Sequence, residues 1–462
     1  MHQRSTHKVN RVHEGILALS VVGVLFGAQR LVAGNPVPTV LFIGVALYGL
    51  TALVARTAVP HKYKLNVLLW LGSLTVGLYA ADALIYRFPP PQRPTFSALR
   101  LETAKALGLQ PDDRTPVEVL DSLRSLGIEV TRYANGRLVR RTKSATIALD
   151  SMALLPLSGV SLSRTVYCNE VSGWIEYVSD QYGYRNPPAA WTEPVYAMLI
   201  GDSFVHGVCV ADSATVAARL REWYPRTVSV AGAGQGPLSN LATVVEYAVP
   251  LEPRHVLWFF FEGNDLTDLD REWTFRVLRN YLLDSQYNQN LFGRQVESDA
   301  QLRDAIEREA EVARTHEERA STGPARHPFW TVVTLGHLRN RLARRARPNT
   351  AEPTSCCNYQ TTLREILSRA NSIVRSWDGS LTFVFLPAYP DSGGSTGASP
   401  VVRDSVLAIV HGLGIPIVRL DSVFEAHRPD DLWYHRYSHL TPYGYAIVAK
   451  TIADHLDRYS ED

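Results

Sequence analysis

The chain has 462 residues, more than one typical domain needs, so two or three structural units are expected. Its composition, 46% hydrophobic and 20% charged, is that of a globular protein. A net charge of +2 without a basic stripe of interleaved aromatic residues argues against a nucleic-acid partner. The four cysteines are too few for a disulfide scaffold, and they lack the paired spacing of a zinc site.

Three apolar stretches that are almost free of charge lie near the N-terminus: Gly15–Val32, Thr39–Ala55 and Leu65–Tyr86. Each is close to the length of about 17–25 residues that a helix needs to cross a bilayer. Their short connections argue against buried core helices, and no A-x-A-like site follows the first stretch, which argues against a signal peptide. Residues 1–94 are therefore predicted to form a membrane anchor of three transmembrane helices, with Asp82 at the interface.

The flanking cations predict the orientation of this anchor. They precede the first span and lie between the second and third, whereas the connection Ala33–Pro38 has none. These cations are Arg4, Lys8, Arg11, Arg56, Lys62 and Lys64. The positive-inside rule places the N-terminus in the cytoplasm, so three crossings leave everything after Phe88 outside it. We expect a multi-pass protein of the cell membrane with an extracytoplasmic remainder.

A stiff proline-rich spacer, residues 89–94, leads into residues 95–190, which we interpret as an accessory or linker region. The region shows helix-then-strand patterns, including a capped helix start at Thr115-Pro116-Val117-Glu118. It contains no recognisable chemical motif.

Short apolar runs alternate with helical stretches over residues 191–462, which predicts one α/β domain with a parallel sheet covered on both faces. The runs are Val195–Ile200, Thr227–Val230, His255–Phe261, Leu381–Leu386 and Pro416–Val418. A long charged helical stretch, about residues 268–347, separates the third run from the fourth. We interpret it as a solvated helical insertion. The more specific alternative is a lid that covers a substrate.

Polar segments follow the first three runs, at the sheet edge where ligands bind in open α/β folds. Ser203 follows the first strand directly, a position that fits a nucleophile but equally a helix cap. Gly234 lies in a glycine-rich segment after the second strand, and Asn264 follows the third strand. Taken separately, the glycines could simply form a tight turn, and Asn264 could simply form an Asx turn. Together, the Ser203 and Gly234 amides and the Asn264 side chain are the donors that an oxyanion hole requires.

Four segments in family order, between Ala197 and Ala449, resemble the SGNH/GDSL hydrolase family. They are Gly201-Asp202-Ser203, Gly234, Gly263-Asn264-Asp265, and Ser438-His439-Leu440-Thr441-Pro442-Tyr443-Gly444-Tyr445. The resemblance implies a flavodoxin-like, three-layer domain in which Ser203 is the nucleophile and His439 the base. It also implies that Ser203, Gly234 and Asn264 form the oxyanion hole. His435 lacks the following turn and helix start, so we rank it below His439.

One position departs from the family pattern. An aspartate usually precedes the histidine by three residues and orients its ring, but Arg436 stands there in this chain. Asp430, Asp431 and a backbone carbonyl are the remaining candidates. The prediction is a Ser–His dyad whose third member is not identified.

A second pattern resembles a membrane-attached, bacterial-type subset of the same family. It consists of Cys168-Asn169-Glu170 followed by Ser179-Asp180-Gln181-Tyr182-Gly183-Tyr184-Arg185-Asn186-Pro187. Cys168 and Cys209 fall in the predicted extracytoplasmic part, where a disulfide and two free buried thiols both fit. Adjacent Cys356 and Cys357 are poorly placed to pair with each other.

These features predict a membrane-anchored serine esterase that hydrolyses an oxygen ester through an acyl-enzyme. The acyl group, such as acetyl, would sit on an envelope glycan or lipid. One alternative is an O-acyltransferase that modifies a cell-surface polysaccharide; three spans are too few to carry acyl groups, so a separate acyl-donor membrane protein would be required. Another is a non-catalytic envelope protein that binds glycan, which the missing aspartate favours. No metal, nucleotide or other cofactor is expected.

Overall fold

The structure is a computed structural model that describes residues 61–88, 96–142, 154–171, 173–191, 194–322, 338, 358–390 and 400–460. Two compact units divide the chain. One comprises residues 1–93 and 319–349, and the other comprises residues 94–318 and 350–462.

The first unit contains one long described helix, α3 (His61–Arg87), which covers the third stretch predicted to cross a membrane. No helix within the described ranges combines the length and the apolar composition that a crossing requires. This finding overturns the prediction that three transmembrane helices precede the sheet. Asp82, predicted to lie at the interface, has a buried carboxylate that accepts a hydrogen bond from the Leu338 amide at 2.7 Å. The other two predicted spans, Gly15–Val32 and Thr39–Ala55, lie outside the described residues.

A five-stranded parallel sheet forms the centre of the second unit. Its strands are β4 (Ala197–Ile200), β5 (Thr227–Ser229), β6 (His255–Phe261), β7 (Ser380–Leu386) and β8 (Ile417–Arg419). They lie in the order β5-β4-β6-β7-β8, with every neighbouring pair parallel. Numbered along the chain, this order is 2-1-3-4-5, which is the flavodoxin-like arrangement. The predicted parallel sheet is confirmed.

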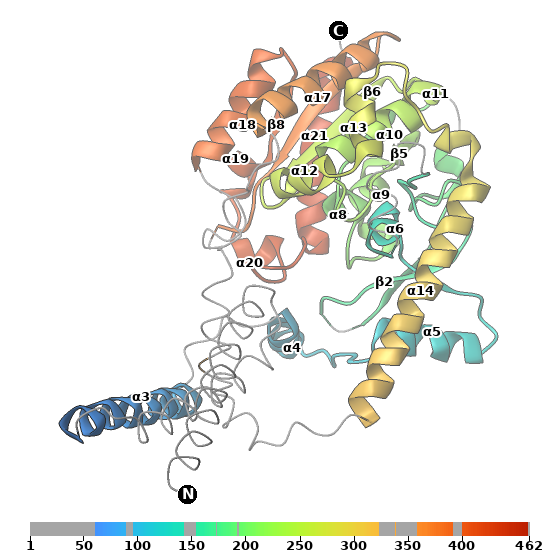
Figure 1. Ribbon diagram of the computed structural model, residues 1–462. Helices are drawn as coiled ribbons and strands as arrows, with labels where there is room; N and C mark the ends of the chain where they lie inside the picture. The colour runs from blue at the N-terminus through green and yellow to red at the C-terminus, as the bar shows by residue number, and fades with distance from the viewer. Residues whose placement is uncertain are drawn as a thin grey trace, which may run out of the picture. The chain divides into compact units, whose positions relative to one another are not determined.

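Side chains of the central strands alternate between two buried clusters, which explains why these strands are apolar almost without interruption. On β6, Trp258 and Phe260 belong to one cluster and Leu257 and Phe259 to the other. Helices that contribute to the first cluster are α10 (Pro237–Thr243), α12 (Asp265–Trp273), α13 (Arg276–Leu283), α17 (Tyr359–Arg375) and α18 (Pro400–Gly412). The second cluster includes α8 (Ser203–His206), α9 (Val216–Leu220), α19 (Leu420–Phe424) and α21 (Pro442–Ser460). The unit is therefore a three-layer α/β structure (Figure 1).

A small sheet precedes the large one in the same unit. It pairs β1 (Thr131–Arg132) in parallel and β3 (Ile175–Val178) in antiparallel fashion with the central strand β2 (Arg164–Cys168). The helices of this region are α4 (Phe96–Ala106), α5 (Pro116–Ser125) and α6 (Gly136–Thr142). The predicted capped helix start is present, because the Thr115 and Glu118 side chains cap the first turn of α5 reciprocally.

The stretch predicted as an insertion is largely helical where it is described, with non-helical connections at residues 274–275 and 284–290. Beyond α13, a short turn at Leu291–Gly293 leads into α14 (Gln295–Thr322). Leu302 and Ile306 of α14 are buried in the first cluster, and Asp299 accepts hydrogen bonds from the Ser161 amide at 2.9 Å and its hydroxyl at 2.6 Å. This part of the stretch therefore packs on the domain. The remaining short helical segments are Pro188–Trp191, Asp212–Ala214, Val244–Ala248, Val249–Leu251 and α20 (Pro429–Leu432).

Candidate active site

Ser203 lies at a sharp strand-to-helix turn at the carboxyl edge of the large sheet. It is the first residue of α8, and two residues, Gly201 and Asp202, separate it from the end of β4 at Ile200. The Asp202 carboxylate caps this short helix by accepting a hydrogen bond from the Phe204 amide at 2.9 Å. The cap fixes the turn, and Ser203 retains 9% exposure there.

His439 lies directly opposite this serine. Its Nε2 is 2.8 Å from the Ser203 hydroxyl oxygen, although 236 residues separate the two along the chain. The ring packs against Phe204 with a centroid distance of 4.6 Å. A bridge between Trp433 and Leu440 holds the histidine loop ahead of α21. The structure thus brings together the two residues predicted to react.

A third residue, Glu170, completes the arrangement. Its buried carboxylate is 2.6 Å from His439 Nδ1 through one oxygen, and it accepts a hydrogen bond from the His439 main-chain amide at 3.0 Å through the other. An ionised carboxylate only accepts hydrogen bonds, so Nδ1 carries the imidazole proton. Nε2 is then free to accept the proton of the Ser203 hydroxyl.

The acids that lie near His439 in the sequence do not reach its ring. Asp430 accepts a hydrogen bond from the Tyr389 hydroxyl at 3.0 Å, and Asp431 pairs with Arg428 at 2.8 Å. Arg436, which stands at the usual acid position, is exposed. These contacts explain why a search close to the histidine could not find its partner.

Sequence reasoning missed Glu170 because the region 95–190 showed no chemical motif. The available signal was the Cys168-Asn169-Glu170 segment, an acid in a pattern to which no function had been assigned. His435, ranked below His439, is buried and accepts a hydrogen bond from the Tyr437 amide at 3.2 Å. It therefore shapes the loop that carries His439.

The charges of His439 and Glu170 stabilise each other. Burial alone lowers the pKa of His439, but the Glu170 carboxylate outweighs this effect and raises the pKa above its ordinary value. Burial raises the pKa of Glu170, but the charge and hydrogen bonds of His439 outweigh it and lower the pKa. The site is thus arranged to stabilise an imidazolium at His439.

Gly234 and Asn264 lie at the same sheet edge, beyond strands adjacent to β4. Gly234 has a φ of +74°, a conformation that favours glycine, and its turn is tied to the nucleophile's strand by a Gly232 N–H to Gly201 carbonyl bond of 3.2 Å. The Asn264 side chain hydrogen-bonds the Asp202 carboxylate. Their donation to an oxyanion stays a prediction.

Buried carboxyls lie behind the nucleophile. Burial raises the pKa of Asp202, and the charge of Asp268 adds to the effect. Burial also raises the pKa of Asp265, followed by repulsion from Asp202. Across the described residues, no three His, Cys, Asp or Glu side chains are arranged to hold a metal ion.

A disulfide between Cys168 and Cys209, with a Cα–Cα distance of 5.5 Å, connects β2 to the segment after α8. Of the two alternatives left open by the sequence, the structure has the disulfide. Arg185 fixes the same segment by donating to the Gly207 carbonyl at 2.6 Å and the Val210 carbonyl at 2.8 Å. Cys356 and Cys357 lie outside the described residues.

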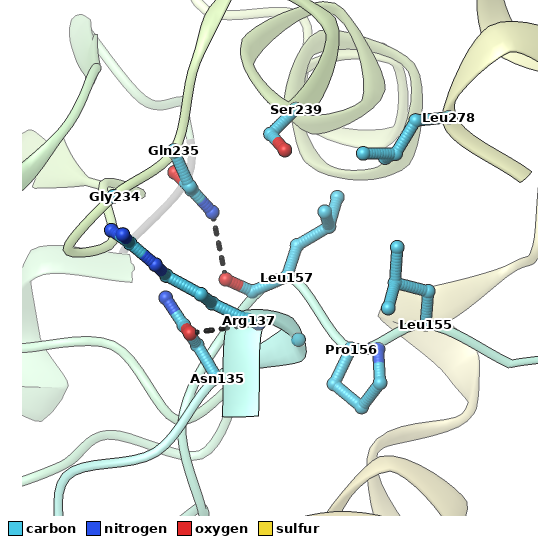
Figure 2. A pocket seen from close by; sticks show the side chains of 10 residues that line it. Asn135, Arg137, Leu155, Pro156, Leu157, Gly234, Gln235, Ser239 and Leu278 are labelled. Atoms are coloured by element: carbon cyan, nitrogen blue, oxygen red, sulfur yellow. Dashed lines mark hydrogen bonds between the residues drawn. The ribbon is translucent and has the colours of Figure 1, made fainter. Parts of the chain in front are cut away.

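A pocket adjoins the turn that carries Gly234 (Figure 2). Figure 2 shows the Arg137 side chain extending from the start of α6 toward Gly234. Next to Gly234, the Gln235 side chain donates to the Leu157 carbonyl at 2.8 Å. The accessory region therefore contributes to the surroundings of the predicted oxyanion turn.

No protein-family model matches the chain, and no curated protein matches its sequence. Solved structures do show similarity. A lipase/acylhydrolase from Enterococcus faecalis is 11% identical, with 56% of this chain and 95% of that chain covered and a TM-score of 0.32. A psychrotrophic esterase from Pseudoalteromonas sp. is 7% identical, with coverage of 58% and 100% and a TM-score of 0.31. A GDSL-like lipase from Bacteroides thetaiotaomicron is 10% identical, with coverage of 58% and 90% and a TM-score of 0.31. At these identities and TM-scores the likeness carries no argument about function, which has to come from the geometry of the site.

Proposed function

We propose that the chain is a serine ester hydrolase of the SGNH/GDSL type. One observation carries this proposal: a continuous hydrogen-bonded series from Glu170 through His439 to Ser203, with contacts of 2.6 and 2.8 Å. A serine hydroxyl is a weak nucleophile near neutral pH unless an oriented base removes its proton. This series supplies both the base and the group that orients it.

In the first half of the reaction, the Ser203 oxygen attacks the ester carbonyl while its proton passes to His439 Nε2. The Glu170 carboxylate stabilises the resulting imidazolium. The amides of Ser203 and Gly234 and the side chain of Asn264 donate to the oxyanion. When the ester C–O bond breaks, the departing alkoxide takes the proton from His439 and leaves an acyl group on Ser203.

In the second half, water attacks the acyl-enzyme and gives its proton to His439. Collapse of this second tetrahedral species breaks the bond to Ser203, whose oxygen recovers the proton from His439. The products are a carboxylic acid and an alcohol, and the site returns to its starting state.

Glu170 also bears on the two alternative functions. The non-catalytic interpretation depended on a missing orienting acid, and the position of Glu170 removes that reason. A transferase would use the same acyl-enzyme with a sugar hydroxyl in place of water. Product analysis with and without an acceptor glycan separates hydrolysis from transfer.

The proposed substrate is an acyl ester on a glycan or lipid outside the cytoplasm. The Cys168–Cys209 disulfide supports the compartment, because disulfides persist in oxidising environments. A screen of acylated glycans and lipids with the purified protein identifies the alcohol.

Replacing Ser203 with Ala tests the proposal directly. We expect Ser203→Ala to lower the turnover of 4-nitrophenyl acetate by at least about a thousandfold, because no other group takes the place of the attacking oxygen. The matched control is Ser122→Ala, on the exposed face of α5, which should retain full activity. Hydrolysis at the wild-type rate in the Ser203→Ala protein would refute the proposal.

A further inference from the structure

An open groove of about 600 Å³ lies beside the turn that carries Gly234. Its lining contains three arginines, no acidic residue, and the turn residue Ala233. The arginines are Arg132, Arg137 and Arg271, and the aromatic side chains that accompany them are Tyr133 and Phe275. A groove with this lining attracts negatively charged groups.

The three arginines differ in their partners. Arg132 pairs with Glu309, and Arg271 pairs with Asp268 at 2.6 Å. Arg137 is exposed, and no carboxylate of the described residues pairs with its guanidinium. Arg137 is therefore the cation in this groove that is available to a ligand.

Several contacts fix the groove against the predicted oxyanion turn. The Ala233 amide donates to the Tyr133 hydroxyl at 2.8 Å, and the Asn135 side chain donates to the Ala233 carbonyl at 2.9 Å. A Cβ added at Gly234 would lie 2.1 Å from Arg137 Nη1, so the guanidinium rests directly on this glycine, as Figure 2 shows. An anion bound to Arg137 would thus lie next to the turn that is predicted to bind the oxyanion.

We propose that the substrate ester carries a carboxylate or phosphate group that binds Arg137 in this groove while its carbonyl lies at Ser203. A guanidinium donates two parallel hydrogen bonds to either group. The proposal deepens the esterase function and rests on it. It assigns the enzyme a preference for anionic esters over neutral esters of the same size.

The test compares three acetate esters that share an acetyl group and a phenolic leaving group. They are methyl 3-acetoxybenzoate, which is neutral, and 3-acetoxybenzoate and 3-acetoxyphenyl phosphate, which are anionic. We expect the wild type to prefer at least one anionic ester, and Arg137→Gln to lower the anionic-to-neutral ratio of kcat/KM by about tenfold or more. The two anionic esters distinguish a carboxylate substrate from a phosphate substrate. An unchanged ratio, or an equal fall for all three esters, overturns the proposal.

Arg226→Gln is the matched control, because Arg226 is exposed just before β5, at the opposite edge of the sheet. This variant should keep the wild-type ratio. Titration of 3-acetoxybenzoate and 3-acetoxyphenyl phosphate into Ser203→Ala and into Ser203→Ala/Arg137→Gln separates the two proposals. Binding to Ser203→Ala that depends on Arg137, together with a wild type that turns over no ester, leaves the anion site standing and refutes the esterase. If the wild type turns over the neutral ester, but Ser203→Ala and Ser203→Ala/Arg137→Gln bind the anionic esters equally, the esterase stands and the anion site is refuted.

Discussion

At the level of single residues, the orienting acid comes from far along the chain. Glu170 lies 269 positions before His439, yet one carboxylate holds both the imidazole ring and the main-chain amide of that histidine. These two bonds fix the rotation of the ring and the position of its loop together. Because Glu170 orients the His439 ring, no acid is needed at the usual position, where the exposed Arg436 stands.

The role of Glu170 predicts both a rate and a pH effect. Glu170→Gln keeps the size of the side chain but removes the charge that stabilises the imidazolium, so kcat/KM should fall by roughly 10²- to 10⁴-fold. Glu170 raises the pKa of His439. Activity rises with pH as His439 loses its proton, so this limb of the pH profile should move to lower pH in the variant.

The matched control for this prediction is Glu176→Gln, because Glu176 is exposed on β3 of the same small sheet. This variant should change neither kcat/KM nor the pH at which kcat/KM rises. Profiles of kcat/KM for 4-nitrophenyl acetate between about pH 4 and 9 supply the measurement. A limb that stays at its wild-type position in Glu170→Gln would show that the carboxylate does not act on His439.

At the level of elements, the small sheet presents the acid to the large one. Glu170 follows β2 by two residues, and Cys168 at the end of β2 is bonded to Cys209, shortly after α8. The Asn169 side chain donates to the Asp112 carbonyl at 2.6 Å. These covalent and hydrogen bonds hold the segment of Glu170 beside the helix that begins with Ser203.

Removal of the disulfide should therefore reduce both stability and activity. Closing a loop across a separation of 41 residues restricts the unfolded chain, and Cys168→Ser/Cys209→Ser should lower the free energy of unfolding by about 2–4 kcal/mol. Its kcat should fall as well, because Glu170 loses an anchor. Urea denaturation and ester turnover measure the two effects. Full activity in a double variant that is clearly less stable would contradict the positioning role.

Local patterns predict some of these elements and not others. The five strands of the large sheet follow from short apolar runs, because strands buried on both faces must be apolar throughout. The acid at Glu170 acts only through a contact with His439, which no local pattern displays. The apolar residues of Leu65–Tyr86 predicted a transmembrane helix, but α3, which covers this stretch, is not long and apolar enough to cross a membrane.

At the level of the whole molecule, the domain buries several carboxyl groups that keep a proton more readily than they would in water. Burial raises the pKa of Asp202 and Asp265. It also raises the pKa of Asp180 to about 6, although four hydrogen-bond donors oppose it. Each of these groups binds more protons in the folded protein than in the unfolded chain over the pH range between its two pKa values.

The stability that these carboxyls contribute should therefore fall as pH rises from about 4 through 6, because each of them binds more protons in the folded state in that range. The raised pKa of His439 acts in the same direction above about 6.5. Buried His206, His255 and His455 act in the opposite direction, because burial lowers their pKa to about 3, about 4 and about 4. Asp202→Asn retains a capping side chain and removes the titrating group. The free energy of unfolding of the wild type minus that of Asp202→Asn, measured by urea denaturation, should therefore be larger at pH 5 than at pH 8.

Asp121→Asn serves as the control for this difference, because Asp121 is an exposed carboxylate on α5. It should leave the dependence on pH unchanged. An Asp202→Asn variant whose free energy of unfolding keeps the wild-type dependence on pH would show that Asp202 does not contribute to that dependence.

Labelling with a fluorophosphonate, followed by mass mapping, tests the central claim most directly, because the reagent needs the nucleophile, the base and the folded site at once. The account predicts modification of Ser203 in the folded wild type, slowed by acidification as His439 takes up a proton and lost in His439→Ala. An unlabelled folded wild type, or a His439→Ala protein labelled at the wild-type rate, would contradict it.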